Sequence, residues 1–525
     1  MAGQSGRRGP TDQAAIATYP VHQFAMLRGV QLLAFQASSE KLRFTAKWPR
    51  GMTRRLSAPP PHQDLNMSHL FSPAAHVKSL TEVLEFIARH LNLRLSVRLW
   101  NGDEIPLGRE VHANLFISLS GPGVVGTLLR RPTLETVTRL YAQGHIDIHG
   151  GNLLDIHAAL QTNGSSRAAI RQISKLFLAK KALPFLFTKT SDADLEHGYT
   201  DDMVGRRESR RVNMQYIQFH YDAGNDFYQL FLDAEMQYTC GYYKDWNNSL
   251  EQSQLDKMEM ICRKLRLEPG ESMLDMGCGW GGLICYAASN HGVKAHGVTL
   301  SKQQYDFAQA KIRSQGLEDL VTVEHGDYRD VEGRYDKISS IGLMEHIGVA
   351  NHPSYFGQIR SMLRDGGILL NHALARSSKK SKRRARKIRP ERKLLLKYIF
   401  PGSELTSVGF TQNAMEHHGF EVHDVEALRE HYALTCRAWC QRLSANEEKA
   451  IKLVGYEKYR MWVAYLAGAS VGLQAGSIKI YQIVATKKAG KGRSGLPPTR
   501  SDLYRSQRDP NQMTGENVIK FSRTG

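Results

Sequence analysis

The sequence predicts an α/β protein: a mostly parallel, doubly wound sheet of the Rossmann-like kind, preceded by a smaller α+β domain. Two observations support this fold class. A glycine-rich turn, Gly277–Gly282, follows the apolar strand Ser272–Met276, and a strand, such a turn and a helix in this order form nucleotide-type binding sites. From about 251 to 488 apolar strands alternate with helical patterns, as expected for a parallel sheet. The 525 residues leave room for about three domains.

The N-terminal third is expected to carry no chemistry of its own. Residues 1–65 predict a basic, flexible leader that ends in the linker Pro59–Pro61. Residues 66–200 predict the α+β domain, with helices at 80–93 and 133–143 and strands at 95–99 and 114–119. No catalytic constellation stands in this segment, so we interpret it as a lipid-binding or docking domain.

Residues 201–250 predict a helical lid over a cofactor. Two aromatic-rich segments, Gln218–Tyr228 and Met236–Tyr242, lie just upstream of the glycine-rich turn. The alternative is that these tyrosines simply pack, with their hydroxyl groups hydrogen-bonded.

The main sheet is predicted from 251 to 488. Its strands are expected at 272–276, 294–299, 321–325, 335–341 and 367–372, with a late antiparallel strand at 477–484. Ligands of such sheets gather at the carboxyl ends of the strands. In the sequence these ends carry Asp275, Thr299, Asp327, Glu345 and His372. Beyond 488 the tail to 525 is polar and is expected to be disordered.

The glycine-rich turn and the strand end before it favour one cofactor class. Gly277, Gly279 and Gly282 have the spacing of a dinucleotide site, with a further glycine at 281, so the glycines alone do not separate the two cofactor classes. Asp275 precedes the first glycine, where a carboxylate can reach an amino group rather than a pyrophosphate. The pattern therefore favours S-adenosylmethionine.

Charge and composition limit the partners and the compartment. The net charge of +19 predicts an anionic partner, either nucleic acid or a membrane surface. The six cysteines show no zinc spacing, which predicts no metal site and a reducing cytoplasm. The N-terminus shows no signal peptide, and the longest apolar stretch, Met461–Leu473, is shorter than a membrane-spanning helix. Membrane association is therefore expected to be peripheral, at the inner face. The sequence leaves the oligomeric state open, a homodimer included.

The basic segment Lys379–Lys393 stands beside the apolar segment Leu394–Pro401, immediately beyond His372. A basic rim next to an apolar surface suits anionic lipid headgroups. The alternative is a solvated loop without a partner. RNA recognition is disfavoured because the basic residues cluster in loops without an aromatic-laced module, so we expect no nucleic-acid partner.

At this point the chain resembles the cyclopropane-fatty-acyl-phospholipid synthase family, which includes the mycolic acid cyclopropane synthases and belongs to the class I methyltransferases. The similarity covers roughly 66–488 and is densest from 215 to 375. It rests on motifs at 219–228, 237–240, 274–282, 297–301, 327–330, 344–348, 398–402 and 460–466.

The resemblance implies transfer of a methylene from S-adenosylmethionine to the cis double bond of an unsaturated phospholipid acyl chain, with bound bicarbonate as the base. It implies a bicarbonate site made by Cys240, Glu345, His372 and Tyr465, with the backbone of Leu374. The implied cofactor residues, besides Asp275, are Tyr238, Thr239, Gly277, Gly279, Thr299, Gln304, Asp327 and Tyr328.

Alternatives remain open at this stage. Some relatives install a methyl or methylene branch instead of a ring, and these motifs do not separate the two products. The basic segment is longer than expected, and Ala373-Leu374 follows the histidine where Thr-Ile is usual. An RNA methyltransferase and a catalytically inactive lipid-binding protein are the remaining readings.

Overall fold

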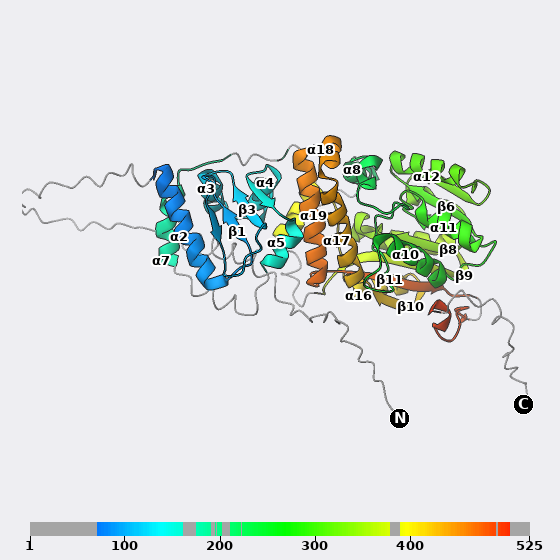
Figure 1. The fold of residues 1–525 in the computed structure, drawn as a ribbon. Coiled ribbons are helices and arrows are strands. Elements are labelled where there is room, and N and C mark those ends of the chain that lie inside the picture. The colour runs from blue at the N-terminus through cyan, green and yellow to red at the C-terminus, as the bar shows by residue number, and fades with distance from the viewer. Residues whose placement is uncertain are drawn as a thin grey trace, which may run out of the picture.

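The computed structural model describes residues 71–160, 175–190, 195, 197–201, 210–221, 223–378, 389–489 and 492–504. They form a small N-terminal domain and a larger α/β part, with helices α17 (Arg429–Ala445) and α19 (Tyr456–Gln474) near the junction (Figure 1). The predicted leader and residues 379–388 of the basic segment lie outside the described residues.

The N-terminal domain is built on a four-stranded sheet in the order β2-β1-β3-β4. β1 pairs in parallel with β3, and the other two pairings are antiparallel. Helix α2 begins where Ser72 accepts a hydrogen bond from the Ala75 amide and ends at Asn92 in the left-handed region, as capping residues should. The elements are α2 (Pro73–Leu91), β1 (Ser96–Arg98), β2 (Glu104–Pro106), β3 (Phe116–Leu119), α3 (Pro122–Arg130), α4 (Leu134–Ala142), β4 (Ile146–His149), α5 (Leu153–Ala159), α7 (Lys175–Ala182) and η3 (Leu183–Phe185).

The larger part contains a seven-stranded sheet in the order β10-β11-β9-β8-β5-β6-β7. The pairings among β5 to β9 are parallel, and β11 pairs antiparallel with both β9 and β10. The predicted mostly parallel sheet with one late antiparallel strand is thus confirmed. The strands are β5 (Ser272–Met276), β6 (Lys294–Thr299), β7 (Val321–His325), β8 (Tyr335–Ile341), β9 (Leu363–Arg376), β10 (Phe420–Ala427) and β11 (Ile478–Lys487).

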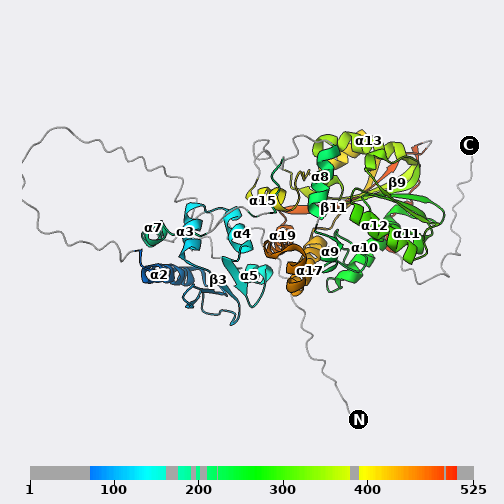
Figure 2. The same cartoon turned by 90° about the horizontal axis from the view of Figure 1, so that it is seen from above.

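Helices pack around this sheet (Figure 2). Apolar side chains of α10 and α11 form one buried core with β5 and β6, whereas α13 contributes to a second core on β8 and β9. The helices of this part are α8 (Arg210–Tyr221), α9 (Asn225–Gln229), α10 (Leu250–Leu265), α11 (Gly282–His291), α12 (Lys302–Ser314), α13 (His352–Met362), α15 (Pro390–Tyr398), α16 (Val408–His417), α17, α18 (Glu447–Val454) and α19, with short 3₁₀ turns η4 (Tyr328–Asp330), η5 (Met344–His346), η6 (Val349–Asn351) and η8 (Ser501–Tyr504).

Arg460 of α19 joins the two parts. Its guanidinium donates to the carbonyls of Tyr141 (2.7 Å) and Ile146 (3.0 Å) and to the carboxylate of Asp147 (2.6 Å). It also lies 3.9 Å from the ring centroid of Tyr141. A buried charge is tolerated when it is paired in this way, so α19 fixes the N-terminal domain against the larger part.

The tail differs from the expectation of disorder at residues 492–504. Leu503 is buried, its carbonyl accepts a hydrogen bond from Arg263 (3.2 Å), and Asp502 pairs with Arg266 (2.9 Å). This segment packs on the end of α10. Among the helices of the described ranges, none has the length and apolar character needed to cross a bilayer.

Candidate active site

A cavity of about 1050 Å³ lies at the carboxyl edge of the large sheet. Its floor is formed by residues after β5, β6 and β8, and α19 forms one wall. The N-terminal domain contributes the far wall through Leu134, Val137 and Tyr141 of α4 and Leu153 and His157 near α5. Both parts of the chain therefore build one site.

The glycine-rich turn opens the cofactor end of this cavity. Gly277 and Gly279 have φ of 80° and 56°, and a side chain at Gly279 would meet nothing within 4 Å. Glycine is favoured by this conformation, and the open space lets a ligand approach the main chain. Of the nine predicted cofactor residues, eight line the cavity: Tyr238, Thr239, Asp275, Gly277, Gly279, Thr299, Gln304 and Tyr328.

Asp327 does not line the cavity. Its carboxylate accepts hydrogen bonds from the amide (3.0 Å) and the side chain (2.8 Å) of Arg329, and the two form an ion pair. The Asp327 side chain, which was expected to face the adenine, is thus paired with the guanidinium of Arg329. Tyr328, its neighbour, does reach the cavity.

Two cofactor-end side chains are held by hydrogen bonds. Burial raises the pKa of Asp275 to about 6, against a hydrogen bond from Ser339 (2.6 Å) that favours the carboxylate. The Thr299 hydroxyl donates to Gln304 Oε1 at 2.7 Å, and the Gln304 side chain also forms a hydrogen bond with Tyr221. These are polar groups suited to the amino and hydroxyl groups of a nucleoside ligand.

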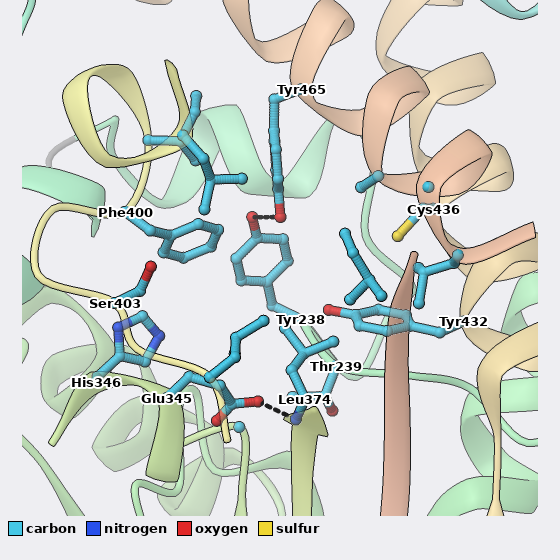
Figure 3. A pocket seen from close by; sticks show the side chains of 18 of the residues that line it. Tyr238, Thr239, Glu345, His346, Leu374, Phe400, Ser403, Tyr432, Cys436 and Tyr465 are labelled. Atoms are coloured by element: carbon cyan, nitrogen blue, oxygen red, sulfur yellow. Dashed lines mark hydrogen bonds between the residues drawn. The ribbon is translucent and has the colours of Figure 1, made fainter. Parts of the chain in front are cut away.

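Aromatic rings surround the middle of the cavity. Figure 3 shows Tyr238 at the centre, with Tyr465, Phe400 and Tyr432 around it, and the hydroxyl of Tyr238 lies 3.5 Å from that of Tyr465. The pKa of Tyr465 is raised by burial, so its hydroxyl stays neutral. Aromatic faces in a dry pocket stabilise positive charge.

A second cavity, of about 20 Å³, adjoins the first. Thr239, Ile341, Gly342, Glu345 and Tyr432 line both, so the two spaces share a wall. Cys240 and His372 line the small cavity with Glu345, whereas Tyr465 lines the large one. The structure thus brings three of the four predicted catalytic residues around one space and places the fourth across the shared wall.

Glu345 is buried, and only one of its two carboxylate oxygens has a hydrogen-bond partner. Its Oε1 accepts a hydrogen bond from the Leu374 amide at 2.6 Å, as Figure 3 shows, while Oε2 has no partner. Burial raises the pKa of Glu345 to about 7, partly offset by the Leu374 amide. The carboxyl group therefore changes its charge near neutral pH.

His372 also presents an unpartnered atom, Nε2. Its other nitrogen, Nδ1, lies 3.3 Å from the amide nitrogen of Gln482, and Gln482 Oε1 accepts a hydrogen bond from Lys264 (2.6 Å). Because the lysine can only donate, the Gln482 amide group must donate to Nδ1. Nε2 then carries the proton in neutral His372, assigned from this network. Burial, with the charges of Lys257 and Lys264, lowers the pKa of His372 to about 3.

Cys240 is a buried thiol rather than a thiolate. Its Sγ lies 3.2 Å from the Gly241 carbonyl, and burial raises its pKa. The buried Lys257 lies behind the wall shared by the two cavities and donates to Thr239 Oγ1 at 2.9 Å. Burial lowers the pKa of Lys257 to about 8.

Lys257, Lys264 and Gln482 were missed by sequence reasoning. The two lysines are seven residues apart on α10, a spacing that puts them on one helix face. The helix face on which they lie otherwise packs against the sheet. Two lysines on such a face were the only sign in the sequence of a buried polar group. Gln482 lies 218 residues from Lys264, so their contact had no local signature.

Basic side chains stand at another edge of the large cavity. Arg376, Arg389 and Arg392 line it with Ser377 and Ser378. Arg376 and Arg392 each donate to a backbone carbonyl of the 403–405 loop. Within the described part of the chain, no group of His, Cys, Asp and Glu side chains has an arrangement that could hold a metal ion.

Comparison with known proteins agrees with this geometry. The family described as mycolic acid cyclopropane synthetase matches residues 208–483. A probable fatty acid methyltransferase of Pseudomonas putida is 34% identical over 417 residues, which is 79% of this chain and 97% of that protein. The cyclopropane-fatty-acyl-phospholipid synthase of Escherichia coli is 38% identical over 320 residues, covering 59% of this chain and 80% of its own.

A solved structure shares the fold. The crystal structure of mycolic acid cyclopropane synthase CmaA1, complexed with SAH and CTAB, superposes with a TM-score of 0.50 at 31% identity, over 52% of this chain and 98% of that one. The match to the family covers more than half of the chain, including the small cavity and the walls of the large cavity outside the N-terminal domain. The chain therefore belongs to the mycolic acid cyclopropane synthetase family and is a methyltransferase dependent on S-adenosylmethionine.

Proposed function

We propose that this enzyme transfers a methylene from S-adenosylmethionine to the cis double bond of unsaturated acyl chains in membrane phospholipids, forming a cyclopropane ring with bicarbonate as the base. One observation carries the proposal. The cofactor end of the large cavity shares a wall with a small cavity that presents two unpartnered polar atoms, Glu345 Oε2 and His372 Nε2.

The small cavity suits a compact anion with one hydroxyl group. Neutral His372 offers an Nε2–H donor, ionised Glu345 offers an acceptor at Oε2, and the buried lysines 257 and 264 contribute positive charge behind them. A bicarbonate ion can accept from the histidine and donate to the glutamate. The cavity is small as it stands, so an ion must displace lining side chains slightly.

The acyl chain reacts in the aromatic middle of the large cavity. When bound, S-adenosylmethionine supplies an electrophilic methyl group and bicarbonate supplies a base. The alkene forms a bond to the methyl carbon as the S–CH₃ bond breaks, which leaves positive charge on the acyl chain. A proton then passes from the new methyl group to the base, and the electron pair of that C–H bond forms the third C–C bond of the ring. Tyr238, Tyr465 and Phe400 stabilise the transient cation with their ring faces and exclude water from it.

Acyl-chain mass spectrometry tests the reaction. Expression in a host that lacks this activity should add one CH₂ to its unsaturated acyl chains. Unchanged acyl profiles, with folded protein that binds S-adenosylhomocysteine, would overturn the proposal.

A branch-forming fatty-acyl C-methyltransferase is the second candidate, favoured by the similarity to the fatty acid methyltransferase of Pseudomonas putida over 79% of the chain. Both reactions add the same mass to the product when a methylene branch forms. NMR separates them, because a cyclopropane has upfield ring protons and a methylene branch has olefinic ones. An RNA substrate fits less well, since apolar and aromatic side chains line the middle of the cavity.

We also infer a peripheral location at the cytoplasmic face of the membrane, with the N-terminal domain as a docking domain. Arg389 and Arg392, at the described end of the Lys379–Lys393 segment, stand at the edge of the large cavity, where lipid phosphate groups would lie if the acyl chain entered there.

A further inference from the structure

Six large apolar side chains are exposed at the far end of the N-terminal domain. We call them the α7 patch: Phe71, Leu129, Leu176, Leu183, Leu186 and Phe187. They are six of the thirteen exposed large hydrophobic residues among those described. Single exposed apolar residues are ordinary on protein surfaces, but a cluster points to a binding surface.

Contacts within the domain hold the patch together. The rings of Phe71 and Phe187 meet edge to face with centroids 5.6 Å apart. Arg130 donates to the carbonyls of Leu186 (3.0 Å) and Thr188 (2.6 Å), which fixes the end of α3, with its Leu129, beside η3. The patch is therefore one surface and not a set of scattered side chains.

Other apolar side chains of α7 and η3 are already used by the fold. Phe177 packs on Phe86 of α2 with ring centroids 4.8 Å apart, and Phe185 is buried in the domain core. By contrast, Leu176 is 82% exposed and Phe187 is 77% exposed. Among the residues that the structure describes, packing of the domain thus leaves these two side chains largely uncovered.

The charge around the patch selects its partner. Residues 175–190 include four lysines and no Asp or Glu. Lys181 pairs with Glu82, while Lys180 and Lys189 are exposed. Apolar side chains that protrude between lysines match the interface of an anionic bilayer, where the chains enter the headgroup region and the lysines meet lipid phosphates. A second copy of this chain would bring the same positive charges and is disfavoured.

The patch is connected to the cavity through packed helices. η3 packs on α3, α3 on α4, and α4 on α15, and Figure 2 shows α7, α3, α4 and α15 following one another from one end of the molecule. α4 and α15 both line the large cavity. Docking at α7 would therefore hold this side of the cavity near the lipid.

We propose that the α7 patch inserts into the interface of an anionic membrane. This deepens the proposed function and rests on it, because an enzyme that modifies phospholipid acyl chains must reach the bilayer. Binding to vesicles can nevertheless be measured without turnover, so the two proposals can fail separately.

The first experiment places a polarity-sensitive dye in the patch. All six native cysteines are buried, so a Phe187→Cys variant can be labelled selectively. We expect blue-shifted emission with vesicles that contain phosphatidylglycerol and little change with pure phosphatidylcholine. The same label at Phe410→Cys on α16, also exposed, serves as the control and should not shift. A blue-shifted spectrum before vesicles are added would show that protein covers the patch, and would overturn the proposal.

The second experiment removes the apolar contact. A Leu176→Glu/Phe187→Glu double variant should bind phosphatidylglycerol vesicles at least tenfold more weakly, while Leu453→Glu on α18, an exposed leucine elsewhere, should bind as the parent does. Turnover of an acyl substrate in detergent micelles should be kept. Unchanged vesicle affinity would contradict the proposal, and so would conversion of a dimer to a monomer by the double variant at equal vesicle affinity. Absent turnover in parent and variant alike would count against the proposed reaction only.

Discussion

At the scale of single residues, the protonation state of Glu345 is expected to set the pH dependence. Its pKa is raised to about 7 by burial, so it is neutral below this pH and ionised above it. Because the Leu374 amide donates to Oε1 and the proposed anion donates to Oε2, the ionised form is the active one. We expect kcat/KM to rise with pH up to about 7 and then to level off, measured as a pH–rate profile.

The matched variant is Glu345→Gln. It should lower kcat by about 10²–10⁴-fold, the range typical for the loss of acid–base chemistry, and remove the rising limb of the profile. Affinity for S-adenosylhomocysteine, measured by calorimetry, should stay nearly unchanged. A parent profile that is flat across neutral pH would refute this assignment.

Gln482 is expected to act through His372. It fixes the tautomer by donating to Nδ1 while Lys264 holds its oxygen. A Gln482→Leu variant frees the histidine to turn or to take the other tautomer. Loss of one such hydrogen bond, worth about 1.4 kcal/mol, should raise the bicarbonate concentration for half-maximal rate about tenfold, with the KM for S-adenosylmethionine unchanged. Equal losses in both KM values would indicate general damage instead.

Among single residues, the sequence indicated eight side chains and glycines that line the cavity, but it did not indicate which side chains pair with one another. The glycines and Thr299 follow directly from the strand ends that carry them. Asp327 also follows a strand, yet it does not line the cavity and its carboxylate pairs with Arg329. Lys264 and Gln482 meet only because α10 packs on the sheet, and no local pattern records that contact.

At the scale of elements, periodicity located four strands of the large sheet with their observed bounds and missed one. The predicted strands 272–276, 294–299, 321–325 and 335–341 have the observed bounds, because each is an apolar or alternating run between turn signals. β10 was not predicted. It is an edge strand whose residues are mostly partly exposed, it carries three acidic residues, and its register shifts between Val422 and Asp424.

The anchoring of α19 gives a prediction for an element. Arg460→Ala should destabilise the protein by about 2–3 kcal/mol, because two carbonyls and the partly exposed Asp147 lose their donor. Hydrogen exchange should increase at α4 and β4. The exposed pair Arg364–Asp336 supplies the control, since Arg364→Ala should cost less than about 1 kcal/mol in a denaturant titration. Similar losses for both variants would mean that α19 does not anchor the domain.

At the scale of the whole molecule, two parts of the chain contribute different halves of one site. The cofactor-end residues all lie between 238 and 328, while α4 and α5 supply the opposite wall. The solved structure of CmaA1 covers 52% of this chain and 98% of its own length, so a related fold exists at about the size of the larger part. Cofactor binding and phospholipid access should therefore be separable here.

Removing residues 1–200 tests this division. The shortened protein should bind S-adenosylhomocysteine within about threefold of the full chain, because the walls around Gly277, Gly279 and Thr299 remain. Turnover on phospholipid vesicles should fall by at least about tenfold, because the cavity loses the wall made by α4 and α5 and the α7 patch is gone, and tenfold corresponds to only about 1.4 kcal/mol. A detergent-solubilised acyl substrate separates the loss of the cavity wall from the loss of the α7 patch. Turnover on micelles depends on the wall alone and should fall less than turnover on vesicles. The fragment must keep its far-UV circular dichroism, which shows that it is folded. If such a fragment no longer bound the cofactor analogue, the two halves would form one cooperative site. α19, which contacts both parts, would then be the element that couples them.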